Sequence, residues 1–247
     1  MPHNSALVTG ANKGIGHAIA AQLAEAGYVV YLGSRDTERG RHAVDELSTD
    51  QRDVRFVAID VTDQASVDAA AAVIDEQFGH LDVLVNNAGI FVQGPTAPSE
   101  TTAEDMARTY DTNVFGVVRV TNAMLPLLRK SHAARIVNIG TEIASLHHLA
   151  EGDHPMGEFP LLLAYNSSKS ALNAITIAYA KELADAGIKV NVAAPGYVAT
   201  DLNGNAGMLS PEQGARIPVQ MATLPADGPT GTFAAADANG GITNPAW

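Results

Sequence analysis

The chain has 247 residues, of which 46% are hydrophobic and 17% charged, with a formal net charge of −12 and no cysteine. This composition fits a globular protein with a sizeable core and excludes a disordered chain, a disulfide framework and a thiolate metal site. The negative charge argues against binding to nucleic acid or to an anionic membrane. We find no run of 18 apolar residues and no signal peptide, so we expect a cytoplasmic protein.

Short apolar runs alternate with stretches of helical periodicity along the whole chain. Strands are expected, in order, at residues 6–10, 28–34, 54–60, 81–89, 135–140, 188–196 and 231–237. Helices are expected between them at residues 14–26, 37–48, 64–78, 102–130 and 162–185. Within the long fourth helix, Pro126 marks a kink or an early end.

This alternation predicts an α/β fold, with a doubly wound parallel sheet covered by helices on both faces in three layers. No linker or repeat divides it, so we expect a single domain over residues 1–247. Loop-like tracts at 90–101, 142–161 and 197–212 all follow strands. They should therefore gather at the carboxyl edge of the sheet, where open α/β folds bind ligands.

The first strand runs into "TGANKGIG" at residues 9–16, and this segment opens the first helix. Gly14 and Gly16 would let the backbone come close to a pyrophosphate, and the first amides of the helix would face that anion. A plain glycine-rich turn is the alternative, but the strand–loop–helix context favours a dinucleotide site. The residues expected to line it are Gly10, Asn12, Lys13, Gly14, Ile15 and Gly16.

The end of the second strand indicates which dinucleotide is bound. Ser34 stands there and leaves room for a 2′-phosphate, which Arg35 can pair with. Lys13 and Arg39 would complete the basic patch, so we expect NADP(H). In the alternative interpretation Arg35 and Arg39 are solvated surface charges, and Asp36 serves NAD.

Tyr165 and Lys169 are four positions apart in "YNSSK" and share one face of a helix. A nearby ammonium favours the phenolate, and lowering the pKa of a tyrosine by ~3 units corresponds to about 4 kcal/mol. The pair is a plausible proton-transfer device. On its own, however, the spacing is weak evidence, because many helices carry it by chance.

Together these motifs resemble the short-chain dehydrogenase/reductase family, and in particular its carbonyl-reductase-like, NADPH-using members. The motifs are T-G-x-x-x-G-I-G at 9–16, D-V at 60–61, N-N-A-G at 86–89, Asn113 in "DTNVFG", Y-x-x-x-K at 165–169 and P-G at 195–196. They span the chain from end to end in the family's order. The resemblance implies a Rossmann fold and an NADPH-dependent reduction of a ketone or aldehyde to an alcohol.

The resemblance also implies roles for individual residues. Tyr165 would protonate the carbonyl oxygen, Lys169 would lower its pKa and bind the nicotinamide ribose, and Asn113 would hold a water of the proton relay. Contacts implied for the cofactor are Asp60 and Val61 at the adenine, Asn87, Ala88 and Gly89 along its length, and Pro195, Gly196, Val198 and Thr200 beside the nicotinamide.

Two features depart from the family's pattern. Thr141 stands where the family has a serine that binds the substrate carbonyl, and it keeps the hydroxyl while adding a methyl group. We expect function with altered substrate room; Ser145 is a second candidate, and a catalytically impaired chain is the alternative. Tyr165 also follows Thr141 by 24 positions, more than is usual, so residues 142–161 form an insertion in the active-site region.

The insertion contains a group of polar residues that raises the question of a metal: His147, His148, Glu151, Asp153 and His154. They lack a tight ligand spacing, so we expect no metal and a role in substrate specificity and subunit packing instead. The expected substrate is a moderately apolar carbonyl compound. The apolar loop residues expected to face it are Phe91, Met156, Phe159, Tyr197, Met208 and Leu209.

Small residues on one face of the helix at 162–185 allow close helix approach, and with the helix at 102–130 this face resembles the family's dimer-forming surface. The resemblance implies a homodimer or homotetramer, although the neighbouring insertion leaves a monomer open. Two rival functions remain. One is an NAD-dependent alcohol dehydrogenase on the same scaffold. The other is a nucleotide-binding sensor that has lost turnover.

Overall fold

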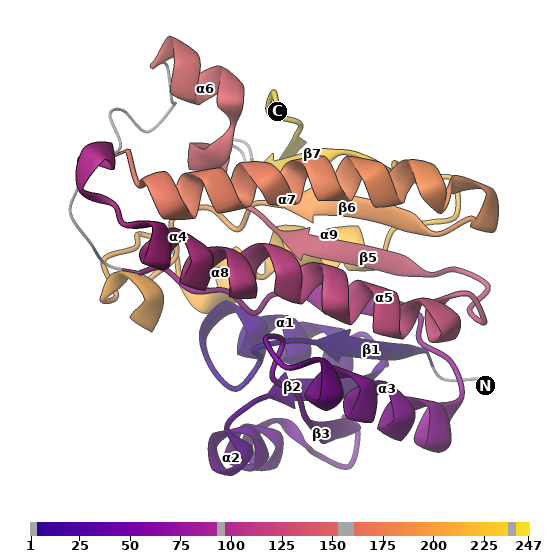
Figure 1. The fold of residues 1–247 in the computed structure, drawn as a ribbon. Coiled ribbons are helices and arrows are strands. Elements are labelled where there is room, and N and C mark those ends of the chain that lie inside the picture. Colours follow the sequence, from indigo (N-terminus) through magenta and orange to yellow (C-terminus); the bar gives the residue numbers. More distant parts are fainter. Residues whose placement is uncertain (1–3, 93–96, 153–160, 237–240) are drawn as a thin grey trace.

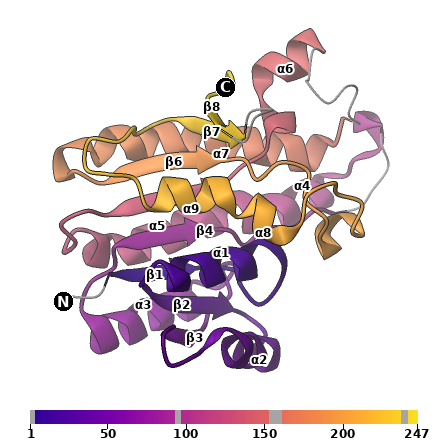
Figure 2. The same cartoon turned by 180° about the vertical axis from the view of Figure 1, so that it is seen from behind.

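The computed structural model describes residues 4–92, 97–152, 161–236 and 241–247. They form an eight-stranded sheet between two layers of helices, as Figures 1 and 2 show from opposite sides. The strand order is β3-β2-β1-β4-β5-β6-β7-β8. Strand bounds are β1 (Ser5–Val8), β2 (Val29–Ser34), β3 (Val54–Ala58), β4 (Val83–Asn86), β5 (Arg135–Ile139), β6 (Lys189–Ala193), β7 (Phe233–Ala236) and β8 (Ile242–Thr243).

Strands β1 to β7 pair in parallel, so the predicted doubly wound parallel sheet is confirmed. The short β8 pairs antiparallel with β7 and was not predicted. Because β1 lies between β2 and β4, the chain builds the sheet outward in two directions from β1. The loops after β1 and β4 therefore adjoin at the point where strand order reverses, which is where such sheets bind ligands.

Helices cover both faces of the sheet. Figure 2 shows α1 (Gly14–Glu25), α2 (Thr37–Leu47), α8 (Pro211–Gly214) and α9 (Arg216–Ala222) on one face. Figure 1 shows α3 (Gln64–Phe78), α5 (Gly116–Leu128) and α7 (Leu163–Glu182) on the other. Each layer buries its own apolar cluster against the sheet; Leu23 of α1 and Met124 of α5 are both fully buried. Helix α8 begins at the end of the predicted loop at 197–212, and α9 lies where the sequence made no prediction.

The predicted long helix at 102–130 is interrupted. Helix α4 (Ala103–Tyr110) and α5 are joined by a π turn over Asp111–Phe115, in which the Gly116 amide donates to the Asp111 carbonyl five residues back. Such turns are frequent at functional sites. Helix α5 ends two residues after Pro126, in line with the expected early end.

Part of the predicted loop at 142–161 is helical. Helix α6 (Leu146–Glu151) follows a short 3₁₀ turn at Glu142–Ala144, and Figure 1 shows it projecting beyond the three layers. Ser145 caps it and Gly152 ends it in the left-handed region, with φ 69°. Over the described parts of the chain, no helix combines the length and apolarity needed to cross a membrane.

Candidate active site

The start of α1 is shaped to receive an anion. No side chain caps this helix, whereas Asp36 and Asp63 cap α2 and α3 by accepting from backbone amides. The amides of the first turn of α1 are therefore left for an outside acceptor. Gly14 has φ +58°, and a Cβ on Gly16 would lie 2.4 Å from Asn87 Nδ2. The loop thus fits a pyrophosphate, and both glycines are needed for its shape.

The turn after β4 is tied to this loop. Asn87 Nδ2 donates to the carbonyls of Thr9 (2.8 Å) and Gly10 (3.1 Å). The hydroxyl of Thr9 accepts from the amides of Asn87 (3.1 Å) and Ala88 (3.0 Å). The structure therefore brings the predicted residues after β1 and β4 together. The bracing role of Thr9 was missed, although this residue directly precedes the first glycine of the motif.

The residues at the end of β2 are those that would distinguish the two dinucleotides. Ser34 is 2% exposed, and its hydroxyl donates to the Asp36 carbonyl at 3.0 Å. Asp36 uses its carboxylate to cap α2, accepting from the Arg39 amide at 3.0 Å, so this acid is engaged away from a ribose. Arg35 is exposed and forms no ion pair with any described residue. It is thus available for an anion.

Asp60, predicted to contact the adenine, lies at the end of β3 beside this patch. Its carboxylate accepts from the amide (2.9 Å) and hydroxyl (2.7 Å) of Thr62. Burial raises the pKa of Asp60, but the Thr62 hydrogen bonds and the charge of Arg35 outweigh it and leave the pKa below the usual value. Val61 beside it is 8% exposed and packs against Gly116. Asp60 is therefore an ionised hydrogen-bond acceptor within the field of Arg35.

The loop after β6 lies against the glycine loop. Lys13 Nζ donates to Asp201 at 2.6 Å, and Thr200 Cγ2 would lie 3.4 Å from a Cβ on Gly14. Val198 pairs with Leu209 to close this loop on itself. Of the residues predicted to flank the nicotinamide, Thr200 thus lies beside the loop predicted to bind phosphate, whereas Val198 packs against Gly214. Pro195 and Gly196 lie at the base of the same loop, where Gly196 has φ +80°.

Tyr165 and Lys169 lie on the first turns of α7, on one face as predicted. Lys169 Nζ is 5.9 Å from the Tyr165 ring centroid and donates to the Ile139 carbonyl at 2.8 Å. Burial raises the pKa of Tyr165 to about 12 and lowers that of Lys169 to about 8. The tyrosine pKa is therefore raised overall and not lowered as the spacing predicted, because burial is the dominant effect on it. Tyr165 is a protonated phenol near neutral pH.

Asn113 lies in the π turn and is 1% exposed. Its Oδ1 accepts from the Ile90 amide (2.9 Å), and its Nδ2 donates to the Ile90 carbonyl (3.0 Å) and to the Ser168 hydroxyl (3.1 Å). The carboxamide thus clamps the segment after β4 to α7. This clamp uses both hydrogens of Nδ2 and one of the two lone pairs of Oδ1. The partner, Ser168, was not singled out from the sequence.

Thr141 and Ser145 take different roles. The Thr141 hydroxyl is half-buried and makes no hydrogen bond within the described chain. Ser145 is fully buried; its hydroxyl donates to the Ala246 carbonyl at 2.8 Å and caps α6. Of the two hydroxyls, only that of Thr141 is left for a substrate.

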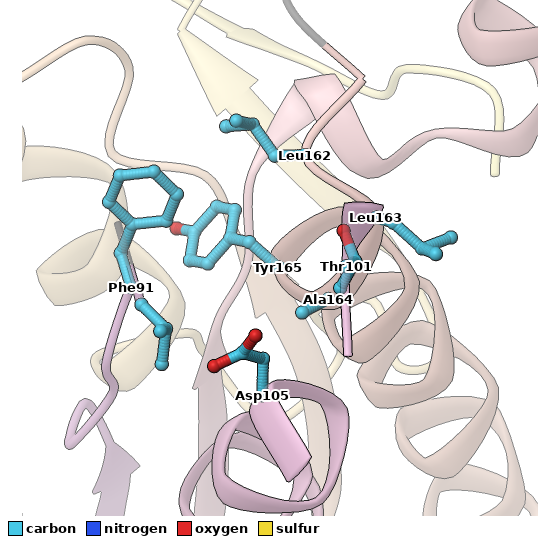
Figure 3. Close-up of a pocket in the computed structure, with 8 residues that line it drawn as sticks. Phe91, Thr101, Asp105, Leu162, Leu163, Ala164 and Tyr165 are labelled. Carbon is cyan, nitrogen blue, oxygen red and sulfur yellow. The ribbon is translucent and has the colours of Figure 1, made fainter. Parts of the chain in front are cut away.

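A pocket opens beside Tyr165, lined by Phe91, Val92, Thr101, Asp105, Leu162, Leu163, Ala164 and Tyr165. Figure 3 shows the Tyr165 hydroxyl directed toward the Phe91 ring, and the two rings meet edge to face at 5.6 Å and 78°. The Tyr165 hydroxyl makes no hydrogen bond with any described residue. Phe91 was expected at the substrate, whereas Met156 and Phe159 fall outside the described residues.

The polar residues of the insertion lie partly within the described chain. Within the described ranges no group of three or more His, Cys, Asp or Glu is placed to hold a metal ion. His147 and His148 lie on α6 with ring centroids 5.5 Å apart. Asp153 and His154 lie outside the described residues.

Comparison with known proteins gives consistent matches along the chain. The profile of the short chain dehydrogenases matches residues 4–208. Short-chain dehydrogenase anuI of Penicillium roqueforti (strain FM164) is 39% identical over 225 residues, covering 88% of this chain and 87% of the relative. Carbonyl reductase (NADPH) 1 of Bos taurus is 34% identical over 268 residues, covering 92% and 94%. The structure of salutaridine reductase from Papaver somniferum has a TM-score of 0.81 at 31% identity, covering 94% and 99%.

Proposed function

The chain belongs to the short-chain dehydrogenase family, and we propose that this oxidoreductase reduces a ketone or aldehyde to an alcohol with NADPH, with Tyr165 as the acid. The family membership rests on the matching profile and on relatives that cover most of the chain. The observation that carries the proposed reaction is the Tyr165 phenol. It stands in the pocket without a hydrogen-bond partner among the described residues, and its raised pKa keeps it protonated. A protonated group at this place suits a donor to a developing alkoxide.

The residues around the phenol support this role. The unengaged Thr141 hydroxyl can donate to the same carbonyl oxygen and fix its position. The Lys169 ammonium, tied to the Ile139 carbonyl, supplies positive charge that stabilises the phenolate left after proton transfer. The clamped Asn113 fixes the π turn, and we propose that its main-chain carbonyl holds the water that returns a proton. In this proposal the substrate carbonyl oxygen is bound and protonated by four residues acting together: Thr141, Tyr165, Lys169 and Asn113.

NADPH would supply the hydride to the carbonyl carbon when bound. The amides of Gly14, Ile15 and Gly16 would hold its pyrophosphate, and Arg35 would pair with the 2′-phosphate together with Lys13 and Arg39. Arg35 is exposed and has no ion-pair partner in the described part of the chain, and Asp36 is engaged as a helix cap; both observations favour NADPH over NADH. The name of the NADPH-dependent bovine relative supports the same choice.

The direct test follows cofactor oxidation with a panel of ketones and aldehydes, comparing NADPH with NADH and the wild type with Tyr165→Phe. We expect turnover with NADPH and loss of nearly all of it in Tyr165→Phe, while NADPH binding persists. Full activity of Tyr165→Phe would contradict the mechanism. Equal use of NADH would favour the alcohol dehydrogenase alternative, and tight NADPH binding without turnover would favour the sensor.

We also propose that the chain forms a homodimer or homotetramer through the α7 face that carries Ser167, Ala171, Ala174 and Ala178. Small side chains allow a second helix to approach closely. The insertion at 142–161 would flank this contact and the pocket. Light scattering of the purified protein would test the assembly, and a monomeric mass would reject it.

A further inference from the structure

The pocket beside Tyr165 holds a carboxylate that the proposed reaction does not use. Among the described residues lining it, Asp105 is the only Asp, Glu, Lys, Arg or His. Figure 3 shows this carboxylate rising from the start of α4 toward the space beneath Phe91 and Tyr165. The other lining side chains are apolar or neutral, so nothing in the described lining offsets its charge.

Asp105 uses only one of its two carboxylate oxygens to cap α4. Oδ2 accepts from the Thr102 hydroxyl at 2.7 Å and lies 3.4 Å from the Thr102 amide, completing a capping box at the start of α4. Oδ1 makes no hydrogen bond with any described residue, and no described Lys, Arg or His forms an ion pair with Asp105. A neutral amide at this position would cap the helix as well. The cap therefore requires neither the negative charge of Asp105 nor its Oδ1.

We propose that Asp105 selects carbonyl substrates that carry a cationic amine, binding the ammonium at Oδ1 while the carbonyl meets Tyr165. This inference rests on the proposed function, because it presumes a carbonyl substrate in this pocket. A carboxylate in a partly buried, largely apolar site attracts a cation more strongly than one in bulk water does. The ring of Phe91 offers a second, cation–π contact to an alkylammonium group. The net charge of −12 also favours the approach of cations over anions.

A matched pair of substrates tests the charge alone: an aryl ketone with a trimethylammonium substituent and its tert-butyl isostere. We expect the wild type to reduce the cationic ketone with at least a 10-fold higher kcat/KM, mainly through a lower KM. Asp105→Asn keeps an oxygen for the Thr102 cap and should lower the cation-to-neutral ratio of kcat/KM by about 10-fold. Glu104→Gln is the matched control, since Glu104 is an exposed neighbour on α4, and it should leave the ratio unchanged.

Binding of phenyltrimethylammonium, measured by calorimetry, gives a readout that does not require turnover. It should weaken about 10-fold in Asp105→Asn and stay unchanged in Glu104→Gln. If the wild type reduced both ketones equally, or if Asp105→Asn kept the cation preference, the inference would be wrong and the proposed function would stand. If neither ketone were reduced while the cation bound through Asp105, the proposed function would fail and the cation site would stand. Binding insensitive to Asp105→Asn would overturn the site in either case.

Discussion

Lys13 and Asp201 join the glycine loop to the loop after β6 by a 2.6 Å ion pair between residues 188 positions apart. Hydrogen bonding and charge from Lys13 lower the pKa of Asp201, and the charge of Arg39 adds to this. Asp201 therefore lies within the field of two basic residues predicted to hold the 2′-phosphate. A carboxylate there competes with a phosphate for Lys13.

Replacing Asp201 by Asn should strengthen NADPH binding. The change frees Lys13 and removes a negative charge near the 2′-phosphate, so we expect a gain of about 2- to 5-fold, consistent with an exposed ion pair. NADH lacks that phosphate and should gain little. Fluorescence titration of both cofactors measures the effect, with Asp227→Asn as an exposed control. An equal gain for NADH and NADPH would show that Asp201 does not act on the phosphate.

Arg35→Ala should weaken NADPH binding selectively. A charge-assisted hydrogen bond contributes about 1.5–3 kcal/mol, which corresponds to a loss of roughly 10- to 100-fold. NADH affinity should be almost unchanged. Arg41→Ala is a suitable control, because Arg41 is also exposed but lies farther along α2. If Arg35→Ala left the NADPH affinity unaltered, either other residues would bind the 2′-phosphate or the enzyme would use NADH.

The pH dependence of ketone reduction should report Lys169. Burial lowers its pKa to about 8, so the ammonium is present below this pH and is lost as the pH rises through it. The phenolate of Tyr165 loses its stabilising charge at the same point. We expect kcat/KM at saturating NADPH to be flat near neutral pH and to fall above about 8. Lys169→Arg should move this fall to higher pH, and a profile unaffected by that change would assign the ionisation to another group.

Much of this architecture follows from the sequence because strands and helices have different apolar periods, and parallel strands bring their following loops to one edge. The glycine loop and the pair Tyr165–Lys169 were found from local patterns, and Asn87 from the resemblance to the family. The π turn around Asn113 was not, since "DTNVFG" fits a continuous helix and only tertiary packing interrupts it. The Lys13–Asp201 pair joins residues too far apart in sequence for any local pattern to predict.

The effect of burial on the pKa of Tyr165 likewise could not be predicted from the sequence. Spacing places the lysine one turn away, but the distance between Nζ and the ring, and the carbonyl that engages Nζ, depend on how α7 packs on β5. Burial then raises the tyrosine pKa where proximity alone predicted a decrease. Local motifs identify the chemical groups, and packing decides their ionisation.

Thr141 offers a test of the departure from the family's serine. Its hydroxyl makes no hydrogen bond within the described chain, so Thr141→Ala should leave stability nearly unchanged while removing a donor to the carbonyl. We expect kcat to fall about 10²-fold or more, as when one oxyanion donor is lost. Thr141→Ser should retain activity and favour bulkier ketones, because a methyl group is removed. Equal activity of the Ala and Ser variants would exclude this hydroxyl from the reaction.

A buried amide network crosses the centre of the sheet below the site. Asn86 Nδ2 donates to Asn138 Oδ1 (2.9 Å) and to the Thr121 hydroxyl of α5 (3.1 Å). Asn138 Nδ2 donates to the Thr176 hydroxyl of α7 (2.8 Å). All four residues are at most 4% exposed, and the two asparagines are register partners on β4 and β5. The network therefore couples the sheet to α5, which follows the π turn of Asn113, and to α7, which carries Tyr165 and Lys169.

Asn138→Ala should destabilise the protein strongly. It removes the acceptor of Asn86 and the donor to Thr176, leaving buried polar groups unpaired at about 1–3 kcal/mol each. We expect the free energy of unfolding, from urea titration, to fall by roughly 2–4 kcal/mol. Asn122→Ala loses only an exposed bond from the Tyr179 hydroxyl and should cost under about 1 kcal/mol. Similar losses for the two variants would mean that the buried network contributes no more than a surface contact.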